Sequence, residues 1–221
     1  MRTITDLPFG QPGKVIAVGL NYKDHASEAK MELPKAPVLF AKWNNCLIAN
    51  GEMIVIPKGV TQVDYEAELA VIIGKQAVRV SEAEALDFVF GYTAMNDVTD
   101  REAQAKDGQW VRSKSYDTFG PIGPLVVPAS EIGDPHNLKI ESRLNGKIMQ
   151  SSNTNNLIFN IPFLISYISQ RITLQPGDVI TTGTPHGVGA FLNPPVFMKS
   201  GDVIEVEIEK IGVLSNPVVD E

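Results

Sequence analysis

Two glutamates in the first third of the chain have the spacing of a metal site. Glu66 and Glu68 lie in segment 62–74, where apolar residues alternate with period two, as in a β-strand that places Asp64, Glu66 and Glu68 on one face. Residues two apart on a strand are roughly 6.5 Å apart and point the same way. Such carboxylates can converge on one hard cation, for example Mg²⁺. The alternative is a solvated acidic edge strand. However, the segment continues as apolar residues on both faces, and unpaired buried carboxylates are costly.

Asp97 is the third carboxylate of interest. It follows a predicted strand at 90–95 and precedes a predicted helix at 100–106, so it lies at a strand end. A helix-capping or turn aspartate is the competing interpretation. Together with Glu66 and Glu68, Asp97 indicates a site for one divalent metal, which we expect to be magnesium.

His25 and Glu28 form a candidate catalytic pair. They are three residues apart in a predicted helix at 22–30, which makes them neighbours on one helix face. A glutamate beside a histidine holds its tautomer and raises its basicity, as a general base requires. A surface ion pair is the alternative. Of the other histidines, His136 is expected in an exposed turn, and His186 either lines a site or faces solvent.

A glycine-rich loop at 181–189 follows a strand and could direct backbone N–H groups at an anion. It lacks Gly-Lys-Ser/Thr, so it is not a nucleotide phosphate loop. Lys114 precedes a turn-rich segment and could contact an anionic substrate, although a solvated lysine is the alternative. The sequence has neither Gly-x-Ser-x-Gly nor His-Glu-x-x-His, so nothing supports a serine esterase or a zinc protease.

Short strands dominate the elements that must position these residues. Eighteen glycines and fifteen prolines imply many turns. Further strands are predicted at 14–20, 38–41, 53–57, 125–128, 138–144, 147–150 and 203–210, and turns opening strands at 176–180 and 200–204. Asn145-Gly146 predicts a hairpin. Further helices are predicted at 81–88, with Ser81 and Glu84 as a capping box, and at 158–170, while Asn21 is expected to cap the helix at 22–30.

Composition limits the classes of protein that the chain can belong to. With 221 residues and 43% hydrophobic residues, we expect one domain over 1–221. The net charge is −7 and no basic cluster is present, so nucleic acid is not expected as a partner. Cys46 is the single cysteine, which excludes an intrachain disulfide and a cysteine-based zinc site. No apolar run reaches the ~18 residues of a membrane span, and residues 1–10 lack a secretory signal pattern. A cytoplasmic protein is expected.

Taken together, these segments resemble the fumarylacetoacetate hydrolase family. The resemblance covers nearly the whole chain and rests on the segments GLNYKDHASE (19–28), VDYEAEL (63–69), MNDVTDREAQ (95–104), KSYDTFG (114–120) and TGTPHGVG (182–189). It corresponds to the catalytic domain alone, as in the short acylpyruvate hydrolase and oxaloacetate decarboxylase branch. Trp43-Asn44-Asn45 departs from the proline and small hydroxyl residues of many relatives. If that segment lines the site, the preferred substrate differs from that of the branch, and Trp43 narrows the pocket or stacks on the substrate. The alternative is that Trp43 packs in the core.

The resemblance implies a fold, a metal and a set of residue roles. The fold is mixed β with short helices, the mixed β-sandwich roll of the family's catalytic domain, and the assembly is usually a homodimer. Magnesium or manganese is bound by Glu66, Glu68 and Asp97. His25 and Glu28 activate water. The substrate is contacted by Lys114, Arg101, Gln104 and Thr184.

The implied reaction is C3–C4 cleavage of a small 2-oxo acid. Acylpyruvates would be hydrolysed and oxaloacetate decarboxylated, both through a pyruvate enolate held by the metal and Lys114. Three alternatives remain open. They are an oxaloacetate keto–enol tautomerase, a hydratase or isomerase of unsaturated 2-oxo acids in aromatic degradation, and a metal-stabilised domain that binds a carboxylate without turnover.

Overall fold

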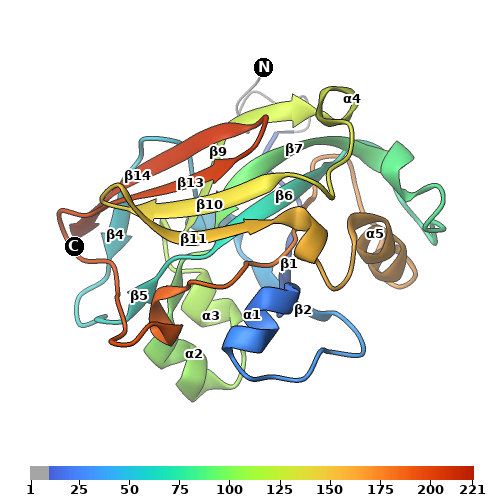
Figure 1. The fold of residues 1–221 in the computed structure, drawn as a ribbon. Coiled ribbons are helices and arrows are strands. Elements are labelled where there is room, and N and C mark those ends of the chain that lie inside the picture. The colour runs from blue at the N-terminus through green and yellow to red at the C-terminus, as the bar shows by residue number, and fades with distance from the viewer. Residues whose placement is uncertain (1–9) are drawn as a thin grey trace.

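A seven-stranded mixed sheet forms one layer of the computed structural model, which describes residues 10–221 (Figure 1). The prediction that residues 1–10 carry no secretory signal therefore concerns, apart from Gly10, residues outside the described part. The strand order is β2-β1-β12-β6-β7-β9-β3. The strands are β1 (Val15–Gly19), β2 (Val38–Lys42), β3 (Leu47–Ile48), β6 (Ala67–Ile73), β7 (Val89–Asn96), β9 (Gly120–Pro128) and β12 (Val179–Thr181). β1 pairs with β12 in parallel and β3 with β9 in parallel, while the other pairs are antiparallel.

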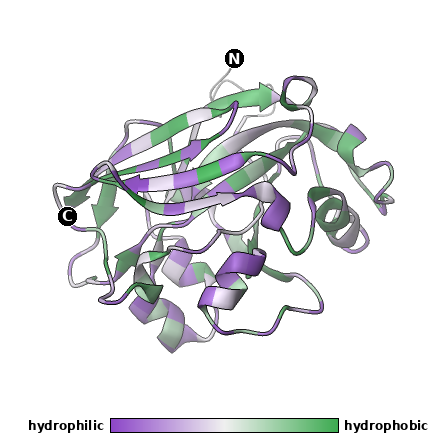
Figure 2. Cartoon of the chain, in the orientation of Figure 1, coloured by the Kyte–Doolittle hydropathy of each residue, from purple (hydrophilic) through white to green (hydrophobic). Residues whose placement is uncertain are grey.

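A five-stranded sheet packs across this layer, in the order β11-β10-β13-β14-β4 (Figure 1). Its strands are β4 (Ile54–Ile56), β10 (Lys139–Leu144), β11 (Lys147–Asn153), β13 (Val203–Ile208) and β14 (Gly212–Asp220). Apolar residues from both sheets form the main core, among them Leu69, Val71, Ile140 and Val206. Figure 2 shows that the inner strands β6 and β9 are predominantly hydrophobic, whereas polar residues are interspersed along β10. The fold is thus mixed β with short helices, as predicted.

Strand β6 lies in the middle of the larger sheet, and all seven of its residues are buried. A strand covered on both faces reads as a continuous apolar run, and this explains the sequence after Glu68. The predicted strand at 62–74 is nevertheless broken. Val63 and Asp64 form β5, which pairs with β8 (Thr99–Asp100), and β6 begins only at Ala67.

The helices are short and lie around the sheets. They are α1 (Lys23–Glu28), α2 (Arg101–Asp107), α3 (Val111–Lys114), α4 (Ala129–Ile132) and α5 (Ile161–Ser169), with 3-10 turns η2 (Asn44–Cys46), η3 (Ala85–Phe88), η4 (Thr154–Asn156) and η5 (Gly189–Phe191). In Figure 1, α1, α2 and α3 all lie below the sheets. α5 buries four apolar residues against the core, and Asn160 caps it by accepting from the N–H of Phe163. The helix predicted at 158–170 is therefore confirmed in a shorter form.

Several local predictions are confirmed. The Asn145-Gly146 turn joins β10 to β11, and both residues have positive φ as a two-residue hairpin loop requires. The strands predicted around 14–20, 38–41, 53–57 and 203–210 all form. No helix among the described residues is long and apolar enough to cross a membrane.

Other local predictions are wrong. Asn21 does not cap α1. Its side chain instead binds Phe159 and Thr182, because backbone groups brought close by tertiary packing compete for it. Ser81 and Glu84 do form a hydrogen bond of 2.5 Å, but only the 3-10 turn η3 follows and not a helix. β14 was not predicted, since Pro217 breaks its pattern.

Candidate metal centre and active site

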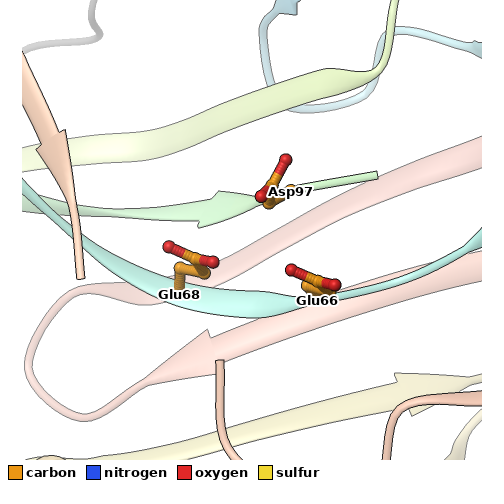
Figure 3. Close-up of side chains that lie close together, drawn as sticks. All are labelled: Glu66, Glu68 and Asp97. Carbon is orange, nitrogen blue, oxygen red and sulfur yellow. The ribbon is translucent and has the colours of Figure 1, made fainter. Parts of the chain in front are cut away.

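Three buried carboxylates converge where two central strands meet. Glu66 and Glu68 belong to the segment that enters β6, and Asp97 follows β7 (Figure 3). The antiparallel register pairs Ala67 with Asn96, so the end of β7 lies beside the start of β6. The backbone N–H of Asp97 donates to the carbonyl of Glu66 at 2.9 Å. One oxygen of each of the three carboxylates lies within 4.8 Å of the others. The cluster therefore depends on the pairing of β6 with β7, which brings Asp97 beside two glutamates about 30 positions earlier in the chain.

Cationic side chains surround two of these carboxylates. The ammonium of Lys114 is 2.9 Å from Glu66 Oε2 and 2.8 Å from Asp97 Oδ2. Lys42 Nζ is 2.7 Å from Asp97 Oδ1, and Arg101 Nη1 is 2.8 Å from Glu66 Oε1. Burial alone would raise the pKa of Asp97, but Lys114 and Lys42 hold it below its ordinary value. The sequence analysis did not predict a role for Lys42. The feature that could have indicated one is its position as a charged residue at the end of the apolar strand β2.

Glu68 differs from its two neighbours. It makes no ion pair with any described residue, and the N–H of Gly183 donates to Glu68 Oε2 at 2.8 Å. Burial, with repulsion from Asp97 and Glu66, raises the pKa of Glu68 well above its ordinary value. Together, Glu66, Glu68 and Asp97 offer three carboxylates, and oxygen atoms are the ligands that a hard divalent cation prefers. In residues 10–221 this is the one group of three or more acidic, His or Cys side chains placed to share a metal. The cluster therefore fits such an ion.

A cavity of about 240 Å³ opens onto the cluster. It is lined by seven of the nine predicted site residues, namely His25, Glu66, Glu68, Arg101, Gln104, Lys114 and Thr184. The other two do not line the cavity but bind residues that do. Asp97 is fully buried and pairs with Lys114, and Glu28 binds His25. Apolar side chains complete the walls: Phe40 and Trp110 meet edge to face, and the Lys114 ammonium lies 5.3 Å from the centre of the Phe40 ring. Folding thus brings together residues spread from 18 to 191.

The histidine–glutamate pair forms as predicted on α1. His25 Nδ1 is 3.1 Å from Glu28 Oε2. The other oxygen of Glu28 accepts from the N–H of Gly187 at 3.0 Å. The His25 ring meets Phe191 edge to face, with ring centres 5.5 Å apart. With Nδ1 held by Glu28, Nε2 is the nitrogen available to exchange a proton with a ligand.

Arg101, Gln104 and Thr184 have donor groups to offer to an anion. Arg101 Nε donates to Asp64 Oδ2 at 2.8 Å and Nη1 to Gln104 Oε1 at 3.0 Å, while Nη2 is buried with no hydrogen-bond partner among the described residues. Burial would lower the pKa of Arg101, but Asp64 and Glu66 raise it. Thr184 Oγ1 accepts from Gln150 Nε2 at 2.8 Å, which leaves its own O–H free to donate.

The glycine-rich loop binds anions, but these are the carboxylates of the protein itself. N–H groups of Gly183, Gly187 and Gly189 donate to Glu68, Glu28 and Asp64, respectively. Asp64 therefore leaves the face that the strand pattern assigned to it beside Glu66 and Glu68, because β5 ends there and Arg101 and the loop bind it. Its role in holding Arg101 was not foreseen.

Three further expectations are resolved by the structure. His136 is more than a turn residue, since its Nε2 accepts from the N–H of Ile161 at the start of α5. His186 is 43% exposed and lies 3.2 Å from Asp24. Trp43 neither narrows the cavity nor packs in the core, because it is 61% exposed and lines hollows outside the site.

Comparison with known proteins identifies relatives of the whole chain. Residues 14–219 match the family described as fumarylacetoacetate (FAA) hydrolase C-terminal. The mitochondrial oxaloacetate tautomerase Fahd2a of Rattus norvegicus is 46% identical over 213 residues, which cover 96% of this chain and 68% of the relative.

Solved structures agree with this match. The 5-carboxymethyl-2-hydroxymuconate delta-isomerase of Mycobacterium smegmatis superposes with a TM-score of 0.85 at 42% identity, covering 95% of this chain and 80% of that one. A fumarylacetoacetate hydrolase of Exiguobacterium antarcticum superposes with a TM-score of 0.88 at 39% identity, covering 96% and 77%.

Proposed function

The chain belongs to the fumarylacetoacetate hydrolase family, and we propose that it is a metal-dependent enzyme that cleaves the C3–C4 bond of a small 2-oxo acid. An acylpyruvate would be hydrolysed and oxaloacetate decarboxylated. The observation that carries this proposal is the convergence of three buried carboxylates and the His25–Glu28 pair on one small cavity.

Magnesium or manganese is the metal that we propose for Glu66, Glu68 and Asp97. All three ligands offer oxygen, which favours these hard ions over zinc or copper. Lys42, Lys114 and Arg101 pair with Glu66 and Asp97, whereas Glu68 forms no ion pair with any residue in 10–221. A bound ion would supply a Lewis acid that polarises the 2-oxo group and favours enolisation.

The protein side chains bind the substrate and move its protons. The free Nη2 of Arg101, the amide of Gln104 and the hydroxyl of Thr184 would hold the C1 carboxylate. Lys114, whose ammonium donates to Glu66, Asp97 and Thr99, would place its positive charge beside the oxygen on which negative charge develops. His25 would take a proton from a water that attacks the C4 carbonyl, and Glu28 would hold the ring in the tautomer that can do so. Loss of CO2 from oxaloacetate needs no such water.

Oxaloacetate keto–enol tautomerisation is the second candidate. A relative 46% identical to this chain is named an oxaloacetate tautomerase, and a structural relative is named an isomerase. The same cavity could serve this reaction, because His25 would only have to move a proton between C3 and the oxygen on C2.

One experiment separates these activities. Purified protein is incubated with oxaloacetate or acetylpyruvate, in magnesium or EDTA, while enol absorbance and pyruvate are followed together. The variants are His25→Ala and Glu66→Ala, with Ser27→Ala as control, because Ser27 is exposed on α1 and its hydroxyl donates to the carbonyl of Lys23, not to a site residue. Pyruvate that requires magnesium and Glu66, and with acetylpyruvate as substrate also His25, supports cleavage. Enol loss without pyruvate supports the tautomerase. Failure of both signals in the wild type refutes both candidates.

A homodimer is the assembly that we propose. β2 is an edge strand of the larger sheet, and beside it lies a hollow of about 450 Å³ lined by Val15, Phe40, Trp43 and Ile172. An exposed tryptophan next to an apolar hollow suits a two-fold interface, in which one surface contacts its own copy. Trp43→Glu should give a monomer in sedimentation, and Ile148→Glu, on the other sheet, should not.

The cytoplasmic location stays a prediction, which cell fractionation tests.

A further inference from the structure

Helix α1 carries the His25–Glu28 pair but has little apolar anchorage of its own. It is six residues long and buries only Ala26. Helices of this length are not stable by themselves in water, so α1 depends on contacts with the rest of the protein. Figure 2 shows α1 as largely hydrophilic. Polar contacts must therefore hold the pair in place.

Asp24 provides most of these polar contacts. Its Oδ2 accepts a hydrogen bond from Ser152 Oγ, a second from Asn156 Nδ2 at 3.2 Å, and lies 3.2 Å from His186 Nδ1. Its Oδ1 accepts from the backbone N–H of His25 at 2.7 Å. One carboxylate thus connects the backbone of the proposed base to two other parts of the chain, the end of β11 with η4 and the glycine-rich loop.

Strand β11 contacts both the glycine-rich loop and α1 through one of its faces. Gln150 and Ser152 are two residues apart on β11, so their side chains point the same way. Gln150 Nε2 donates to Thr184 Oγ1 and to the carbonyl of Pro185 in the glycine-rich loop. Ser152 binds Asp24. The strand therefore sets the position of α1 relative to Thr184.

The two ends of the α1 segment are held very differently. Before the helix, Asn21 binds Phe159 and Thr182, and Tyr22 is fully buried. After the helix, residues 30–36 are mostly exposed. A helix fixed at one end only can swing about that end. The Asp24 contacts, with the Glu28 bond to Gly187, oppose this motion.

We propose that Asp24, bound by Ser152 and Asn156 and lying 3.2 Å from His186, is a positioning residue that fixes His25 over the cavity and keeps it in register with Thr184. The proposal deepens the proposed function and rests on it for the catalytic consequence. Asp24 is not part of the carboxylate cluster and does not itself line the cavity, and the lining residue that it binds is His25, so it acts through His25.

Hydrogen–deuterium exchange of the full-length protein tests the positioning directly. Asp24→Asn removes the charge while keeping the shape of the side chain, and Ser152→Ala removes one donor. Hydrogen bonds to a charged group are stronger than neutral ones, so losing the charge should speed exchange of the α1 amides about tenfold. Ser152→Ala should act in the same direction but less. Ser27→Ala is the matched control and should exchange like the wild type. Unchanged exchange of α1 in both Asp24→Asn and Ser152→Ala overturns the proposal.

Kinetics of the same variants test whether Asp24 acts through His25. For Asp24→Asn we expect kcat to fall about tenfold, with KM and the magnesium Kd from calorimetry within twofold of the wild type. In a His25→Gln background, Asp24→Asn should leave the residual kcat unchanged, because the group through which it acts is absent. A further tenfold fall in that background overturns the positioning role. If no 2-oxo acid is turned over, the proposed function fails, and exchange still decides whether Asp24 holds α1.

Discussion

Replacing Glu68 with Gln should stabilise the protein when no divalent metal is present. Glu68 is 1% exposed, lies close to Glu66 and Asp97, and has no cation partner among the described residues. Its raised pKa reflects burial first and then repulsion from those two carboxylates. Glutamine has the same shape and no charge, and its amide oxygen can still accept from the N–H of Gly183.

The expected size of the effect follows from the cost of burying a charge. Removing an ion from water costs several kcal/mol after relaxation, and Lys114 offsets part of the repulsion at Glu68. We therefore expect Glu68→Gln to raise the free energy of unfolding in EDTA by about 1–3 kcal/mol. For a chain of this length, 1 kcal/mol shifts Tm by about 2–4 °C. Magnesium at about 100 times its Kd should add about 2.7 kcal/mol to the wild type and much less to the variant.

Thermal unfolding of both proteins in EDTA and in magnesium measures this reversal. Glu68→Gln should have the higher Tm in EDTA, and its advantage should disappear or invert in magnesium. A variant that is less stable than the wild type in EDTA would show that Glu68 is compensated in the metal-free protein. The reasoning about the uncompensated carboxylate would then be wrong. A variant that gains as much from magnesium as the wild type would refute Glu68 as a ligand.

Three further predictions concern single residues. His25→Gln should lower kcat by about 10²–10⁴, the range for a lost general base, with magnesium affinity unchanged in calorimetry. Gly19→Ala places a Cβ 2.3 Å from the Trp110 ring, so it should lower stability by about 1–3 kcal/mol in urea unfolding. Asp202→Asn should cost about 1–2 kcal/mol at pH 7. Burial opposes ionisation of Asp202, but its hydrogen bonds, chiefly that from Lys199, hold its pKa below the ordinary value. Because the folded pKa lies below the unfolded value near 3.9, this stabilisation is present above about pH 4 and is lost as pH falls through the folded pKa. Urea unfolding should therefore show the difference between wild type and Asp202→Asn shrinking at acid pH.

Strands and turns with a strong local pattern were predicted correctly from the sequence. The hairpin at Asn145-Gly146 forms because both residues tolerate positive φ, a purely local requirement. β6 forms because its apolar run is buried on both faces. Predictions failed where a distant group competed for a side chain. Asn21 is a good helix cap by type, yet the carbonyls of Thr182 and Phe159 bind it instead.

The sequence by itself determined which groups could do chemistry. Glu66 and Glu68 are two residues apart in a segment with strand alternation, and His25 and Glu28 are three apart in a helical segment, so spacing predicts that each pair shares a face. Each pair lies within or directly beside one regular element, which is why spacing alone could predict it.

Only the tertiary structure decided how these pairs meet and which charges they face. The register of β6 with β7 brings Asp97 to Glu66, and the fold places Lys42 against Asp97, while no cation from the described part of the chain pairs with Glu68. Asp24 reaches β11 across more than 120 residues. No local pattern encodes such contacts, because they depend on how sheets pack. That packing also removes water from these groups, and their pKa values depend on its removal.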